Sequence, residues 1–155
     1  MTAMASSAFV YVTYIRSNPE TVWQALTTPE FQRRYWFGMH QECDFRKGSP
    51  WKLVFEDGRV ADDGEVLESD PPKRLVLRWR NRMRPELTDE GDARCEMTLA
   101  DEGGATKLTI THSIALEHSK LIEAVSGGWP KILSSLKSLI ETGEPMDSIY
   151  SRAKA

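Results

Sequence analysis

The sequence has few of the residues that build disulfide frameworks and metal sites. It holds two cysteines and three histidines in 155 residues, with no Cys-x-x-Cys and no closely spaced histidine pair. A disulfide framework or a zinc site needs more ligands at defined spacings. We therefore expect Cys43 and Cys95 to be reduced, mostly buried thiols. No phosphate-binding glycine loop is visible either, so the sequence predicts no metal and no other cofactor.

Long apolar runs and an excess of one charge are also missing. No run approaches the length of a membrane span, about 20 apolar residues. Residues 1–8, MTAMASSA, lack the basic start and the long apolar stretch of a secretory signal. The formal net charge of −3 gives no overall attraction to nucleic acid or to an anionic membrane. We therefore expect a cytoplasmic protein without a membrane span and without a nucleic-acid partner.

The N-terminal part predicts one strand and two short helices. Residues 9–16, FVYVTYIR, are rich in β-branched and aromatic side chains, which is typical of a strand. Asn18-Pro19 is a helix start signal, because asparagine caps well and proline suits the first helical position. Thr28-Pro29 repeats this signal before a second short helix.

From residue 41 to residue 114 the apolar period is 2, which predicts consecutive half-buried strands. Asp57-Gly58 is a strong hairpin signal, and Gly64 indicates a bulge or bend in the strand that follows. Residues 84–92 are polar and turn-rich, and are expected to form a flexible connection. His40 and His118 are expected in connections as well. Short turns between the strands imply an antiparallel meander.

The C-terminal part returns to a helical period, with an apolar stripe from Leu121 to Ile140. Gly127-Gly128 and Pro130 interrupt the stripe, and Pro130 has no N–H for the carbonyl of Ser126. We therefore expect a short helix, a kink or break near Gly127, and a main helix over about residues 129–142. The predicted fold class is α+β: a curved antiparallel sheet of about seven strands around a long C-terminal helix. Residues 1–155 are expected to form a single domain with its core at about residues 9–143.

Five segments occur in the order expected of one family: SNPETVWQALTTPEFQRRYW, GSPWKLVFEDGRV, GEVLESDPPKRLVLRW, KLTITHS and GGWPKILSSLKSLIE. The chain thereby resembles the heat-shock-90 ATPase activator homologue family, within the START-type and pollen-allergen-type helix-grip (SRPBCC) superfamily. The resemblance covers roughly residues 9–143 and implies the helix-grip fold. The resemblance leaves two classes of function open. The first is binding of a small apolar molecule between sheet and helix, as in most superfamily members, with or without weak enzymatic chemistry, since some members are cyclases or related enzymes. The second is contact with a protein partner, as in the founding co-chaperone.

The candidate ligand contacts are large side chains predicted to lie between the sheet and the helix. They are Trp36, Trp51, Phe55, Leu77, Trp79, Met97, Ile110, His112, Trp129, Leu133 and Leu136. A curved sheet packed on one helix leaves volume between large rings, and aromatic and methionine side chains suit apolar ligands. The alternative is that these side chains simply fill the core. Trp79 and Trp129 are expected to be buried where the two layers meet under either interpretation.

His112 is the most informative polar candidate, because alternation places it on the inner face with Leu108 and Ile110. It is predicted to anchor the polar end of a ligand or to act as a general base. The alternative is a buried histidine that bonds a backbone carbonyl or a hydroxyl. No serine or cysteine is suitably spaced to form a nucleophile–base pair with it, so catalysis is not predicted.

A basic row, Arg78, Arg80, Arg82 and Arg84, alternates along one predicted strand and its continuation. A nucleic-acid interface would need more such rows and a basic domain. We therefore expect this row to lie on the solvated outer face of the sheet, with the arginines paired to nearby glutamates.

Overall fold

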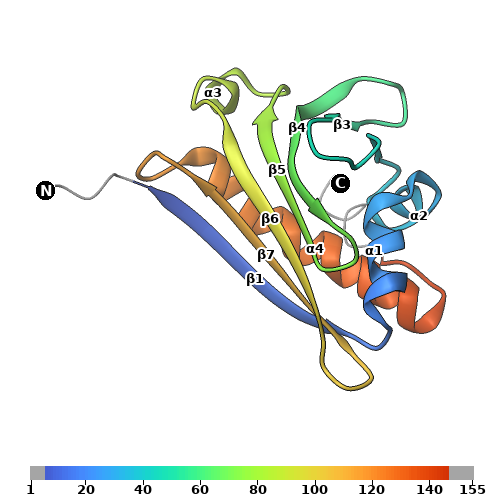
Figure 1. Cartoon of the computed structure of the whole chain (residues 1–155). Coiled ribbons are helices and arrows are strands. Elements are labelled where there is room, and N and C mark those ends of the chain that lie inside the picture. The colour runs from blue at the N-terminus through green and yellow to red at the C-terminus, as the bar shows by residue number, and fades with distance from the viewer. Residues whose placement is uncertain (1–5, 147–155) are drawn as a thin grey trace, which may run out of the picture.

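The computed structural model describes residues 6–146. Its strands form one antiparallel sheet in the order β1-β7-β6-β5-β4-β3-β2. The strands are β1 (Ser7–Ile15), β2 (His40–Glu42), β3 (Pro50–Val54), β4 (Val60–Asp70), β5 (Arg74–Asn81), β6 (Ala93–Asp101) and β7 (Thr106–Ile114). Figure 1 shows helix α4 running along one side of this sheet, while α1 and α2 lie together near one end. The predicted α+β helix-grip fold is confirmed.

The helices are α1 (Pro19–Thr27), α2 (Pro29–Tyr35), α3 (Pro85–Thr88) and α4 (Lys120–Thr142). The first start signal works as predicted, since the Asn18 side chain accepts a hydrogen bond of 2.8 Å from the backbone N–H of Thr21. At the second start, Pro29 opens the helix, but the Thr28 side chain makes no capping bond.

Helix α4 is continuous over 23 residues, so the predicted break near Gly127 is wrong. Ser119 caps its start by accepting a hydrogen bond from Ile122 N–H, and Gly143, at φ 85°, ends it. Pro130 removes one backbone hydrogen bond, an interruption that costs about 3 kcal/mol in a helix interior. Buried side chains on both sides of Pro130, from Leu121 to Leu139, pack into the same core. Tertiary packing therefore outweighs the local helix-breaking signals.

The bulge or bend expected at Gly64 also needs correction. Gly64 lies in unbroken register, and the irregularities fall between Val66 and Glu68 and between Leu53 and Val54. A Cβ atom at Gly64 would lie 1.7 Å from the carbonyl oxygen of Arg78, so this glycine permits close approach of β4 and β5 rather than a bulge.

Two of the predicted connections contain regular structure. His40 begins β2, a strand too short to show an alternating pattern. The expected flexible connection at 84–92 contains α3, whose Leu87 is buried in the core.

The sheet has one buried and one polar face, as its alternating pattern predicts. Along β7, every second residue from Thr106 to Ile114 is buried. On the outer face, the arginine row is paired: Arg78 lies 3.7 Å from Glu65, and Arg82 lies 2.9 Å from Asp63. Cys43 is half-buried, Cys95 is fully buried, and both are free.

Candidate functional site

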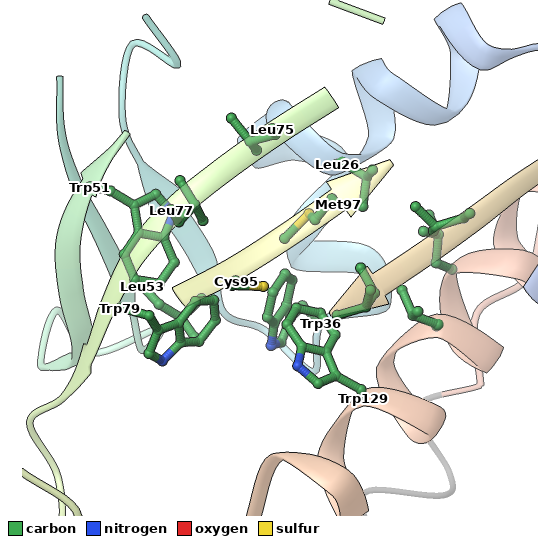
Figure 2. Close-up of a cluster of buried hydrophobic side chains, with 14 of the residues drawn as sticks. Leu26, Trp36, Trp51, Leu53, Leu75, Leu77, Trp79, Cys95, Met97 and Trp129 are labelled. Atoms are coloured by element: carbon green, nitrogen blue, oxygen red, sulfur yellow. The ribbon is translucent and has the colours of Figure 1, made fainter. Parts of the chain in front are cut away.

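Four of the tryptophans form a continuous cluster between sheet and helix. Trp51 on β3 and Trp79 on β5 both lie opposite Gly64 of β4. Because that position has no side chain, their ring centroids approach to 4.4 Å across the middle strand. Trp129 of α4 continues the cluster, 5.9 Å from Trp79 and 5.6 Å from Trp36. Figure 2 shows Trp51 beside Trp79, and Trp36 beside Trp129. The predicted burial of Trp79 and Trp129 is confirmed.

An open pocket of about 490 Å³ lies beside this cluster. One wall is the N-terminal half of α4, and the other is formed by β3, β4, β5 and the segment that leads into α3. Among the predicted ligand contacts, Trp36, Phe55, Trp79 and Trp129 line the pocket. The remaining candidates are buried in the core and do not line the pocket: Trp51, Leu77, Met97, Ile110, His112, Leu133 and Leu136.

The pocket contains a buried carboxyl group that the sequence analysis missed. Asp62 of β4 is 7% exposed, and its Oδ1 accepts a hydrogen bond of 2.9 Å from Nε1–H of Trp79. Desolvation raises the pKa of Asp62 to about 7, although hydrogen bonds from Trp79 and Asn81 oppose this change. The signal was available in the alternation of β4, which places Asp62 on the same face as Gly64 and Val66.

Asn81 is held in place beside this carboxyl group. It lies directly opposite Asp62 in the β4–β5 register. Its Oδ1 accepts hydrogen bonds from the backbone N–H groups of Met83, at 2.9 Å, and Arg84, at 3.0 Å. With the oxygen occupied on the loop side, the amide NH₂ is the group available to Asp62. The chain turn after β5 therefore holds the Asn81 amide beside Asp62, and the two form a polar end in a pocket with mainly apolar walls.

His112 does not line the pocket but is hydrogen-bonded to Trp129 in the core. Its Nδ1 accepts a hydrogen bond of 3.1 Å from Nε1–H of Trp129. Because an indole N–H can only donate, the neutral imidazole carries its proton on Nε2. Nε2 is buried and has no hydrogen-bond partner among residues 6–146. The partner is thus an indole, not the predicted carbonyl or hydroxyl, and desolvation lowers the pKa of His112 to about 4.

Because His112 is buried in its neutral form, the free energy of unfolding depends on pH. We expect it to fall less in His112→Gln than in the wild type when the pH is lowered from 7 to 4. In the unfolded chain the histidine has its ordinary pKa of about 6.5. The contribution of the neutral, buried ring is therefore complete above pH 6.5 and is lost as the pH falls to about 4. The pKa difference between the unfolded and the folded state corresponds to about 3 kcal/mol in the free energy of unfolding.

Urea unfolding at pH 7, 5.5 and 4 measures the effect, with exposed His118→Asn as the control. Asp62 changes stability with pH in the opposite direction, because its pKa is raised in the folded state. Its contribution to the free energy of unfolding is complete below pH 3.8 and is lost as the pH rises through about 7. Both variants keep Asp62, so its contribution cancels in the comparison. Parallel pH profiles for wild type and His112→Gln would contradict the assignment.

Within residues 6–146, no group of three or more His, Cys, Asp or Glu side chains could hold a metal ion. No helix in that range is long and apolar enough to cross a membrane. The absence of a cofactor stays a prediction.

Comparison with known proteins identifies a family for this chain. The family model for "Activator of Hsp90 ATPase homolog 1-like protein" matches residues 16–141. A search of curated proteins finds no match.

Solved structures share the fold at low identity. CalU16 from Micromonospora echinospora is 23% identical, with a TM-score of 0.74, and the match covers 96% of this chain and 83% of CalU16. MLL2253 from Mesorhizobium loti is 23% identical, with a TM-score of 0.74 and coverages of 87% and 97%. The Aha1 dimer from Colwellia psychrerythraea is 22% identical, with a TM-score of 0.70 and coverages of 88% and 98%. The family model covers most of the chain, which therefore belongs to the Activator of Hsp90 ATPase homolog 1-like family.

Proposed function

We propose that this protein binds a small apolar molecule in the pocket between α4 and strands β3–β5. Members of this fold family commonly bind small hydrophobic ligands. The pocket volume of about 490 Å³ lies within the range of small-molecule sites, about 300–1,000 Å³. Three tryptophan rings and aliphatic side chains such as Leu53 and Ile132 line it. Such walls, with few polar groups, suit an apolar ligand.

The observation that carries the proposal is Gly128. A glycine in a helix interior costs about 1 kcal/mol relative to alanine. Close packing does not require it here, because a Cβ atom at Gly128 would meet nothing within 4 Å. Gly128 also lines the pocket. The missing side chain thus leaves one wall of the pocket open, which is useful to a ligand and of no use to a filled core.

Fluorescence titration with N-phenyl-1-naphthylamine, an apolar dye that brightens in apolar sites, tests the proposal. We expect saturable binding to the wild type and at least a tenfold loss of affinity in Gly128→Phe, whose ring would occupy the pocket. The matched control is Gly127→Phe, since Gly127 is exposed, does not line the pocket and also has free space around its Cβ position. Both variants remove one glycine from α4, so both are expected to fold.

Displacement of the dye by fatty acids, which have a polar head, tests the role predicted for His112. His112→Ala is expected to weaken binding of ligands with a polar head if His112 anchors that head, and to leave their affinity unchanged if it only supports Trp129. Circular dichroism establishes that the variant is folded before the affinities are compared.

The alternative function, contact with a protein partner, is favoured by one observation. Val10, Val12 and Tyr14 are 58%, 42% and 51% exposed on β1, at the edge of the sheet. Exposed apolar side chains on an edge strand are a typical site for association. If no dye or fatty acid binds and a crystal structure shows the pocket closed by side chains, this alternative replaces the ligand-binding function.

A further inference from the structure

We infer that the pocket selects apolar molecules that carry a protonated amine, with the carboxylate of Asp62 as the counter-ion. This inference rests on the proposed function and names the chemical class of its ligand. Asp62 lines the pocket and is more than nine-tenths buried. It is therefore a buried charged group that a ligand in the pocket would meet, while the other charged lining residue, Arg84, is more than half exposed.

Asp62 lacks a cation of its own. No ion pair joins it to any side chain within residues 6–146. Its hydrogen bonds come from two neutral groups, the indole of Trp79 and the amide of Asn81. A carboxylate has about four acceptor positions, so two remain after these bonds. An ammonium group can use both and supplies the missing positive charge.

The surrounding rings favour a cation as well. Trp36, Trp79 and Trp129 line the same pocket, and tryptophan is the aromatic side chain that attracts cations most strongly. A pocket that holds a carboxylate bonded to Trp79 and is lined by two further tryptophan rings is therefore a suitable site for an alkylammonium group. The apolar body of the ligand would then lie along Ile132 and the open wall at Gly128.

Other charges near Asp62 are compatible with this assignment. Asp63 points to the outer face, where Arg82 pairs with it at 2.9 Å. Arg84 is the other charged residue in the pocket lining, and its guanidinium group pairs with Glu86 at 2.7 Å while remaining more than half exposed. The lining residues of α4 carry no charge. A carboxylate ligand would face Asp62 without a free cation deep in the pocket.

The test compares three probes of one shape: 1-naphthylmethylamine, 1-naphthalenemethanol and 1-naphthoic acid, each displacing N-phenyl-1-naphthylamine at pH 8. We expect the amine to bind at least tenfold more tightly than the alcohol, and the acid to bind most weakly. In Asp62→Asn, which keeps an oxygen for the Trp79 N–H, the amine should lose its advantage. Equal affinities of amine and alcohol, a preference for the acid, or an unchanged preference in Asp62→Asn would each overturn the inference.

A second measurement uses the wild type alone. Between pH 8 and pH 5.5 the alkylamine stays protonated, and His112, with its pKa lowered to about 4, stays neutral. Asp62 takes up a proton over this range, since its pKa is raised to about 7. Affinity for the amine should therefore fall with pH by roughly tenfold or more while affinity for the alcohol stays constant. If the dye binds but amine affinity is independent of pH, this inference fails and the proposed function stands; if the dye does not bind, both fail.

Discussion

Replacing Trp129 with alanine is expected to lower the free energy of unfolding by about 3–5 kcal/mol. Trp129 is 2% exposed and contacts the rings of Trp36 and Trp79, so its removal leaves a large cavity between α4 and the sheet. Its indole N–H is also the hydrogen-bond donor to buried His112. Without this donor, Nδ1 of His112 stays buried and unpaired, which adds to the loss.

Chemical denaturation of the variant measures this effect, and Trp23→Ala serves as the control. Trp23 lies on α1, is partly exposed and is absent from the ring contacts that join the cluster. Trp23→Ala should lower the free energy of unfolding clearly less than Trp129→Ala does. A shift for Trp129→Ala no larger than the shift for Trp23→Ala would show that the cluster does not hold the two layers together.

Gly64→Ala is the second substitution with a large expected effect. The new Cβ atom would lie 1.7 Å from the carbonyl oxygen of Arg78, a backbone atom that cannot rotate away. Strands β4 and β5 must then separate locally, and Trp51 and Trp79 lose the empty position across which they meet. We expect a loss of roughly 3 kcal/mol, the upper end of typical overpacking costs.

Gly127→Ala is the matched control, because its Cβ would meet nothing within 4 Å and its helical position favours alanine. That variant is expected to gain about 0.5–1 kcal/mol. Urea unfolding of both proteins measures the pair of opposite shifts. Equal stability of Gly64→Ala and the wild type would mean that the close approach of β4 and β5 is not a constraint.

The sequence predicted the layers well because both hydrophobic periods are local and strong. The alternation along β7 and the stripe along α4 each identify a buried face without knowledge of the partner. The continuity of α4 could not be predicted, since Gly127, Gly128 and Pro130 are all local signals for a break. Only the shared core on both sides of Pro130 explains why the helix continues.

The aromatic part of the candidate site was predicted from the sequence, whereas its polar part was missed although the alternation of β4 carried a signal for it. Large aromatic side chains on an inner face are recognisable in the sequence as candidate ligand contacts, and Trp36, Trp79 and Trp129 do line the pocket. Asp62 resembles a surface residue, because it stands in an acidic stretch beside Asp63. Its burial depends on the register of β4 with β5, which places it opposite Asn81. The position of the open wall depends on Gly128, whose surroundings only the packed structure defines.

The proposed ligand is a small apolar molecule in the pocket between α4 and strands β3–β5. A crystal structure of the protein grown with N-phenyl-1-naphthylamine tests this proposal most directly. We expect electron density for the dye against Trp36, Trp79 and Trp129, beside the open wall at Gly128. A structure in which the pocket holds only water, or is closed by these rings, while the dye lies elsewhere would contradict the proposal.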